Sequence, residues 1–143
     1  SQKIHKMKKI KFLMLLSVAI GLGSCNTARV NSNSLQGEWQ LVTMGTTAVT
    51  AEAQPTLQLN IKEMKVNGSD SCNTFMGGIA NITDKDLVFG ELATTLMLCP
   101  ETTMQVADSF GTAMKKVAKY EVNDNQLLLK DDKGEVLLIF TKK

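Results

Sequence analysis

The chain has 143 residues, 43% of them hydrophobic, which allows one domain of ordinary size and leaves little room for a second. Its formal net charge of +2 is unevenly distributed: five of the 16 basic residues and none of the 14 acidic residues precede residue 25. The remainder is therefore mildly acidic and lacks the clustered basic face that nucleic-acid binding requires, so we expect no nucleic-acid partner.

The distribution of histidine excludes several classes of enzyme. The only histidine, His5, lies inside the segment that we interpret below as a leader. The rest of the chain therefore cannot form Ser-His-Asp or Cys-His nucleophilic sites, or metal sites with histidine ligands. We expect a protein that is not an enzyme and that holds no cofactor or metal ion.

Residues 1–24 have the organisation of a signal peptide. A basic stretch at 8–11 precedes a predominantly apolar run of eleven residues at 12–22. At about 1.5 Å per residue, a helix of that length is much shorter than the ~30 Å hydrocarbon core, so it is typical of a signal peptide and not of a membrane span. We interpret Met7 as the initiator and residues 1–6 as an N-terminal extension.

The signal peptide ends in Leu22-Gly23-Ser24-Cys25, which resembles the bacterial lipobox. The resemblance implies cleavage between Ser24 and Cys25, and lipidation of Cys25 with the two or more acyl chains that stable membrane anchoring needs. Asn26 stands where an aspartate would resemble an inner-membrane retention signal, so we expect an outer-membrane anchor that faces the periplasm. The alternative is an ordinary cleaved signal peptide with an unmodified Cys25.

After the lipidated cysteine, residues 25–34 are polar and are interpreted as a flexible tether, with the folded domain at 35–143. Alternation of apolar and polar side chains predicts short strands in the domain. The predicted strands cover residues 39–44, 56–62, 64–66, 79–82, 87–89, 120–122, 127–129 and 136–140. Residues 45–53 are predicted as a loop, and Asn67-Gly68 as a turn between strands.

One segment has helical periodicity. From Glu101 to about residue 118, apolar side chains recur with the spacing of an amphipathic helix. Gly111 inside this helix costs about 1 kcal/mol relative to alanine, so we expect another element to approach closely there. The predicted fold is mainly β (β-rich α+β), with about seven or eight short antiparallel strands in a barrel-like curled sheet and one helix near 101–118.

The three cysteines are expected to have two different fates. With Cys25 lipidated, Cys72 and Cys99 remain as an even pair, which we expect to form a disulfide in the oxidising periplasm. Closing a loop of about 27 residues would stabilise the fold by roughly 3 to 4 kcal/mol in the chain-entropy account. The alternatives are two buried free thiols and, with no histidine to activate it, a catalytic thiol.

Three motifs together resemble the META domain family, which includes HslJ-like heat-inducible bacterial lipoproteins. They are Leu35-x-Gly37-x-Trp39-x-Leu41, Gly68 through Ser71-Cys72-Asn73-x-Phe75-x-Gly77, and Leu92-Ala93-Thr94-Thr95-x-Met97-x-Cys99, and the last predicted hairpin adds to them. Ser71 departs from the family, which often has glycine before Cys-Asn. The resemblance implies a barrel-like antiparallel sheet with one packed helix, and an association with envelope stress and antibiotic tolerance. The family has no established catalytic residues.

The motif side chains have structural interpretations, each with a functional alternative. Asn73 is expected to cap a turn or a short helix. Thr94 and Thr95 are expected to be strand-edge hydroxyls that bond local backbone, or else to line a polar site. The larger aromatic residues are most simply core, or alternatively a ligand-binding box; they are Trp39, Phe75, Phe89 and Phe110.

Two acidic pairs, Asp84 with Asp86 and Asp131 with Asp132, lie in predicted hairpin turns and do not match the calcium-binding loop of EF-hands. A histidine-free hydrolase would need two carboxylates facing each other across a cleft, and the sequence places these acids in turns.

We therefore expect a non-enzymatic, lipid-anchored envelope protein that binds an envelope protein or another envelope component in a stress-protective role. The alternative is a carrier that holds a small apolar ligand inside the barrel. An internal apolar cavity of several hundred Å³ would favour the carrier, and a barrel filled by side chains would favour protein binding.

Overall fold

The structure is a computed structural model that describes residues 32–50 and 52–143. The predicted signal peptide, the predicted lipidation site Cys25 and most of the predicted tether lie outside the described residues. Within the described part of the chain, no helix is both long enough and apolar enough to cross a membrane.

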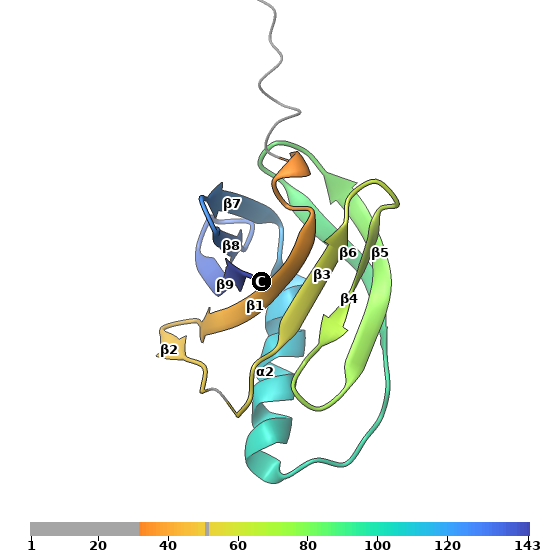
Figure 1. Cartoon of the computed structure of the whole chain (residues 1–143), viewed down its shortest axis with the longest axis vertical. Coiled ribbons are helices and arrows are strands. Elements are labelled where there is room, and N and C mark those ends of the chain that lie inside the picture. Colours follow the sequence, from red (N-terminus) through yellow and green to blue (C-terminus); the bar gives the residue numbers. More distant parts are fainter. Residues whose placement is uncertain (1–31, 51) are drawn as a thin grey trace, which may run out of the picture.

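The described residues form nine strands and one long helix, α2 (Figure 1). The elements are β1 (Gly37–Met44), β2 (Thr47–Ala48), β3 (Thr56–Asn60), β4 (Lys65–Ser69), β5 (Thr74–Ile82), β6 (Leu87–Thr94), α2 (Glu101–Lys116), β7 (Lys119–Asn123), β8 (Gln126–Lys130) and β9 (Val136–Lys142). The predicted fold class is confirmed. The additional strand is the two-residue β2, which lies in the predicted loop 45–53 and pairs only with β1.

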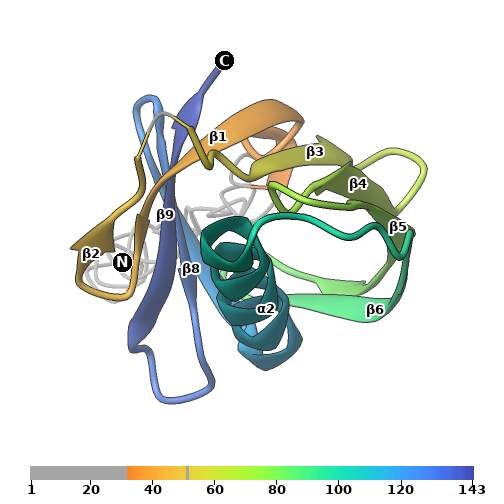
Figure 2. The same cartoon turned by 90° about the horizontal axis from the view of Figure 1, so that it is seen from below.

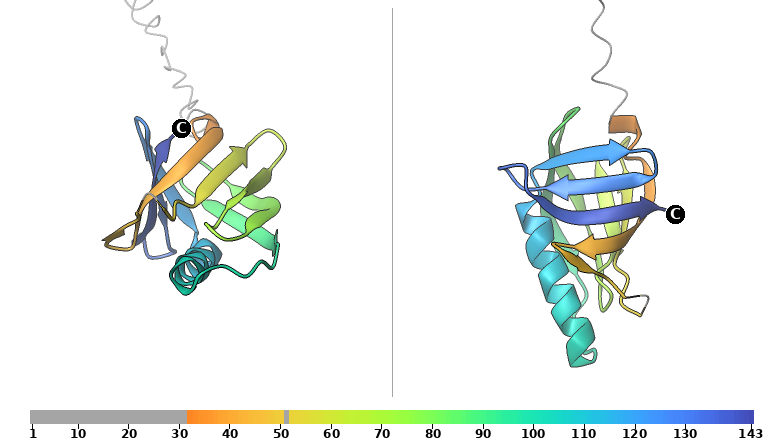
Figure 3. Two further views of the ribbon diagram at one scale, coloured as in Figure 1. Left: turned by 60° about the horizontal axis from the view of Figure 1, so that its bottom comes forward. Right: turned by 90° about the vertical axis from the view of Figure 1, so that its left-hand side faces the viewer.

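The strands form one curled antiparallel sheet in the order β6-β5-β4-β3-β1-β9-β8-β7. Viewed from below, the sheet is a half-barrel, and α2 lies between the flank that contains β8 and β9 and the flank formed by β4, β5 and β6 (Figure 2). The side view shows α2 running along the open side of the sheet and extending past the ends of the strands (Figure 3).

Alternate side chains along the strands point inward and fill the interior of the half-barrel. In β3, Leu57 and Leu59 are fully buried while Gln58 between them is exposed. In β1, Trp39 and Leu41 face the core, and the pairing with β9 shifts register just after Leu41. Every member of the apolar run 136–140 in β9 is buried or half-buried, as in a strand covered on both faces.

The helix joins the two flanks of the sheet through its buried face. The ring of Phe110 lies 5.8 Å from that of Phe75 on β5 and 6.3 Å from that of Phe140 on β9. Aromatic pairs at this separation add to the stabilisation from burial alone. The helix ends at Lys116, two residues before the predicted limit, because Val117 is already extended.

The two edge strands, β6 and β7, meet at one end. The Leu87 amide donates to the Ala118 carbonyl at 3.0 Å, and the Tyr120 amide donates to the Lys85 carbonyl at 2.9 Å. Between them lies an isolated antiparallel bridge at Asp86. We call this contact, formed by residues 85–87 and 118–120, the seam.

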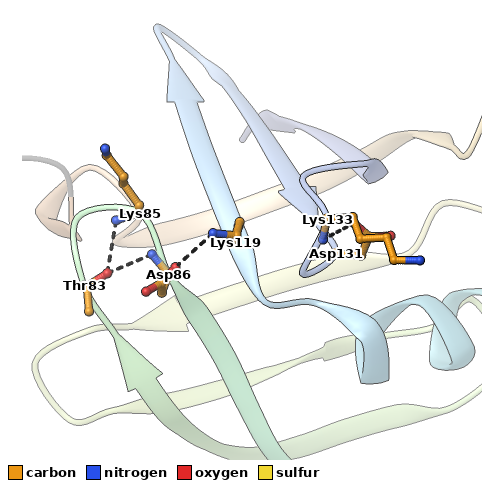
Figure 4. A network of polar contacts seen from close by, with 6 residues as sticks. All are labelled: Thr83, Lys85, Asp86, Lys119, Asp131 and Lys133. Carbon is orange, nitrogen blue, oxygen red and sulfur yellow. Dashed lines mark hydrogen bonds and ion pairs between the residues drawn. The ribbon is translucent and has the colours of Figure 1, made fainter.

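Side chains reinforce the seam. The Asp86 carboxylate lies 3.8 Å from the Lys119 ammonium, and the Thr83 hydroxyl accepts the Asp86 amide at 2.8 Å (Figure 4). The Tyr120 hydroxyl donates to the Thr83 carbonyl at 2.8 Å. The seam therefore closes one end of the half-barrel.

Two sequence-based predictions about glycine were wrong. Gly68 is not in a turn: it lies inside β4, where an added Cβ would be 2.1 Å from the Thr56 carbonyl oxygen and 2.9 Å from the Phe75 ring. Its missing side chain allows β3 and Phe75 to approach. Conversely, no element of the described part of the chain packs closely on Gly111, where an added Cβ would meet none of its atoms within 4 Å.

The strands β5 and β6 are longer than the predicted 79–82 and 87–89. Glycines lie inside both strands without ending them. An added Cβ at Gly77 would be 2.6 Å from the Glu91 carbonyl oxygen, beside a register shift between the two strands. Gly77 thus permits close approach at a bulge.

Candidate functional site: the groove between β6 and α2

Beyond the seam, β6 and α2 leave a groove of about 1100 Å³ between them. Its walls are the second half of β6, one face of α2 and the segment 95–98 that connects them. Apolar side chains from all three walls line it, among them Leu92, Met97, Met104, Phe110 and Met114. We call it the β6–α2 groove.

The groove is distinct from the interior of the half-barrel. That interior is filled by side chains with essentially no exposure, including Trp39, Leu57, Leu127, Leu138 and Phe140. Because the space lies between an edge strand and a helix and opens to solvent, it is shaped as a surface binding groove.

Three consecutive apolar residues at the end of the groove are exposed. The exposed fractions are 94% for Leu96, 59% for Met97 and 98% for Leu98. Adjacent apolar side chains with this exposure mark a site of interaction far more often than single exposed residues do. We call Leu96, Met97 and Leu98 the apolar ledge.

Hydrogen bonds hold the ledge in place. The Asn73 carboxamide oxygen accepts the Thr95 hydroxyl at 2.9 Å and the Met97 amide at 2.7 Å. The Thr95 hydroxyl in turn accepts the Thr74 amide at 3.2 Å, and the Thr95 amide donates to the Thr74 carbonyl at 3.1 Å. The ledge is therefore fixed to the start of β5.

The predicted disulfide is confirmed, and it anchors the far end of the ledge. Cys72 and Cys99 are bonded, with their Cα atoms 6.0 Å apart. The Cys72 sulfur also lies 3.7 Å from the Met104 sulfur, which brings the first turns of α2 to the same place. One covalent bond thus ties together the β4–β5 turn, the ledge and the helix.

The prediction that Asn73 caps a local turn was wrong, because Asp70 has that role. A carboxylate oxygen of Asp70 accepts the amides of Cys72, at 2.9 Å, and Asn73, at 2.6 Å. Ser71 has φ of 86°, in the left-handed region that favours glycine. This explains physically why glycine suits the position that Ser71 occupies here.

The other motif residues divide between core and groove. Trp39 and Phe75 are buried, and the Trp39 indole N–H donates to the Leu35 carbonyl at 2.9 Å. Phe89 is only half-buried and lines the groove, and Thr94 is exposed there at the edge of the sheet. Thr95 bonds local backbone, as predicted, and also lines the groove.

Carboxylates predominate around the groove. Asp70, Glu91 and Asp108 line it, against one ammonium group, Lys115. None of these four side chains forms an ion pair within the described residues. The groove is therefore apolar at its base, with a net negative rim.

The acidic pairs of the hairpin turns lie elsewhere. Asp86 belongs to the seam, and the Asp131 carboxylate accepts the Lys133 amide at 2.9 Å within the β8–β9 turn (Figure 4). In the described ranges, no three histidine, cysteine, aspartate or glutamate side chains are grouped so that they could hold a metal ion. Burial, together with the charges of Asp84 and Asp86, raises the pKa of Tyr120 to about 12.

Sequence reasoning missed the groove and the ledge. The run Leu96-Met97-Leu98 fits neither strand nor helix periodicity, and it lies just before Cys99-Pro100. An apolar run without periodicity, fixed at one end by a cysteine, was the available signal.

The fold and site define a class of protein: a β-rich half-barrel with one helix and a disulfide-bound groove at the sheet edge. The profile of the META domain matches residues 32–143, and the chain belongs to the META domain family. No protein of curated function matches it at a significant level.

Solved structures share the architecture. An NMR structure of a protein from Burkholderia xenovorans is 25% identical, with a TM-score of 0.62, and the match covers 78% of this chain and 86% of that one. A second NMR structure is 23% identical with the same TM-score, covering 78% and 94%. A crystal structure of a DUF4847 family protein from Bacteroides vulgatus is 12% identical, with a TM-score of 0.56, and the match covers 80% of this chain and 96% of that one. The second NMR structure and this crystal structure show similarity in fold alone.

Proposed function

We propose that this META domain is a non-enzymatic binding module on a lipid-anchored protein of the bacterial envelope, with a role in stress or antibiotic tolerance. The observation that carries the proposal is the β6–α2 groove with its apolar ledge, in which Leu96 and Leu98 are almost fully exposed. Outer-membrane anchoring through Cys25 and the stress role follow from the lipobox and the family resemblance.

The way the ledge is held supports a binding role. Exposed leucines on a loose loop would lose conformational freedom on binding a partner, which weakens affinity. Here the Asn73 hydrogen bonds and the Cys72–Cys99 disulfide have already ordered the segment. A disulfide that organises the site also suits an oxidising compartment such as the periplasm.

A second candidate is a carrier of a small apolar ligand, now placed in the groove instead of inside the barrel. The observation that favours it is the apolar base formed by Leu92, Met104 and Phe110. The filled interior of the half-barrel gives no support to a ligand held there.

Metabolic labelling tests the anchor. Cells that express the full chain are grown with a clickable palmitate analogue, and we expect the protein to take the label and to fractionate with the outer membrane. The Cys25→Ala variant should remain unlabelled; a variant that still took the label would refute lipidation at Cys25.

Photocrosslinking in living cells tests the binding role. A photoreactive amino acid replaces Leu96 on the ledge, and the matched control replaces Lys133, an exposed residue in the β8–β9 turn. We expect a discrete crosslinked envelope component from position 96 that is absent from position 133. The same products from both positions would mean that the ledge has no binding preference.

A further inference from the structure

We infer that the free half of β6 binds an extended, basic and apolar polypeptide segment, which adds to the sheet as a further strand between β6 and α2. The inference rests on the proposed binding role of the groove and specifies the class of partner. The observation behind it is a sheet edge that forms one wall of an apolar groove.

The unpaired edge is confined to the groove. At the seam, the Leu87 amide points away from β5 and bonds Ala118, whereas the Thr95 amide points toward β5 and bonds Thr74. Between Phe89 and Leu92 the register shift places one extra residue in β6, which reverses the alternation between these two ends of the strand. Counted back from Thr95 in regular alternation, the N–H and C=O groups of Leu92 and Thr94 point away from β5. Since β6 is the terminal strand of the sheet, these groups face the groove.

The groove has the dimensions of a bound strand. At about 3.3 Å per residue, the edge from Gly90 to Thr94 spans roughly 16 Å, enough for several ladder hydrogen bonds. The volume of about 1100 Å³ exceeds the usual range for small-molecule pockets. Opposite the edge, Gly111 leaves α2 without a side chain, so a second backbone can approach there.

Alternation gives the added strand two kinds of contact. Side chains pointing inward would meet the apolar base at Phe110 and Met104, and those pointing outward would meet the rim. One end of the strand would lie against the leucines of the apolar ledge. Backbone hydrogen bonds would supply affinity, and the alternating contacts would supply selectivity.

Charge selects the partner. The rim carries Asp70, Glu91 and Asp108 against Lys115, and no ion pair within the described residues neutralises them. A segment that alternates basic with apolar residues complements this arrangement. Edge-to-edge pairing with a second copy would instead bring Glu91 on β6 and Asp108 on α2 of one copy close to the same carboxylates of the other, which like-charge repulsion disfavours.

Peptide binding to the purified full chain in detergent tests the inference. The probe is a short fluorescent peptide that alternates lysine with valine, read by polarisation at low salt. Its two controls are the same peptide with alternate amides N-methylated and one that alternates glutamate with valine. We expect both controls to bind at least about tenfold more weakly, because one lacks ladder donors and the other repels the rim.

Variants locate the binding. Asp108→Lys should weaken binding of the lysine-valine peptide by about five- to tenfold and strengthen that of the glutamate-valine peptide. The matched control is Glu135→Lys, the same charge change at an exposed turn residue away from the groove, with affinity unchanged. Gly111→Met should also abolish binding, because the new side chain enters the groove while methionine remains a better helix former than glycine.

Several outcomes would overturn the inference. Equal binding of the N-methylated peptide would exclude strand addition, and equal effects of Asp108→Lys and Glu135→Lys would exclude the groove. Concentration-dependent dimers lost in Gly111→Met would identify a second copy as the occupant. A fluorescent fatty acid that binds when the peptides do not would identify an apolar ligand, and photocrosslinking from Leu96 would still test the wider binding role separately.

Discussion

The two halves of β6 differ in what lies along their outer edge. In the first half, the backbone at Leu87 bonds to the segment before β7, and the seam closes the half-barrel. In the second half, from Gly90 to Thr94, α2 stands away from the strand and leaves the β6–α2 groove. The outer edge of β6 is therefore hydrogen-bonded to the protein in its first half and open to solvent in its second half.

The difference shows how the fold places an interaction site without leaving a whole edge exposed. A long free edge invites aggregation, and proteins usually cover or shorten it. Here the seam covers one part, and α2, held by Phe110 between two flanks of the sheet, stands over the rest. What remains is a short, helix-flanked edge that an extended partner can reach only through the groove.

The largest change in the free energy of unfolding should come from a substitution in the close-packed part of the sheet, at β3 and β4. In Gly68→Ala, the new methyl group would lie 2.1 Å from the Thr56 carbonyl oxygen, so β3 and β4 must separate. We expect the free energy of unfolding to fall by about 4 kcal/mol or more, measured by denaturant titration with Trp39 fluorescence. Gly78→Ala is the matched control, because its nearest new neighbour is 3.7 Å away; an equal loss there would contradict the explanation.

The next largest effect should come from removing the disulfide, which we expect to loosen the groove and leave the seam intact. Replacing Cys72 and Cys99 together by serine should lower the free energy of unfolding by about 3 kcal/mol, since the bond closes a 27-residue separation. Hydrogen exchange should show lost protection around the apolar ledge, including the Met97 amide, while the Leu87 amide in the seam is unaffected. Equal loss of protection at both places would mean that the disulfide holds the whole fold and not the groove in particular.

The closed part of the fold could largely be predicted from the sequence. Alternation located β1 and β3, and helical spacing located α2, because both patterns report burial directly. Glycine caused two errors: Gly68 was interpreted as part of a turn, whereas it allows close approach within strands, and Gly111 was expected to allow close packing, whereas no described residue lies near it. A sequence does not say whether glycine is present for a turn or for space.

The site was harder to predict, for a physical reason. A groove arises where two elements diverge, and no local sequence pattern reports how far apart β6 and α2 lie in the fold. The disulfide followed from cysteine counting. The roles of Asp70 and Asn73 were not separable from sequence, because both side chains can bond nearby amides.

The seam can be probed through the only tyrosine of the chain, Tyr120. Burial and the nearby Asp84 and Asp86 raise its pKa from 10.0 to about 12, so its tyrosinate absorbance should appear only near pH 12 in the folded protein and near pH 10 in denaturant. The raised pKa stabilises the fold fully below pH 10, and this contribution, no more than about 2 kcal/mol, is lost as the pH rises through 12.

Removing a nearby charge provides the control for Tyr120. Asp84→Asn should lower the pKa of Tyr120, whereas Asp132→Asn in the β8–β9 turn should leave it unchanged, because Asp132 is not among the groups that act on it. A folded-state titration near pH 10 would mean that the seam opens in solution and that the two halves of β6 are alike.

The smallest expected change in the free energy of unfolding is an increase, and it comes from a substitution beside the β6–α2 groove. In Gly111→Ala, the new methyl group would meet no atom of residues 32–50 or 52–143 within 4 Å, so the helix gains propensity without a clash. We expect the free energy of unfolding to rise by about 1 kcal/mol, detected as a higher denaturant midpoint with an unchanged slope. The same glycine-to-alanine change that disrupts β4 should thus stabilise α2; a loss of stability would mean that another part of the chain covers this face of the helix and that the groove is closed in solution.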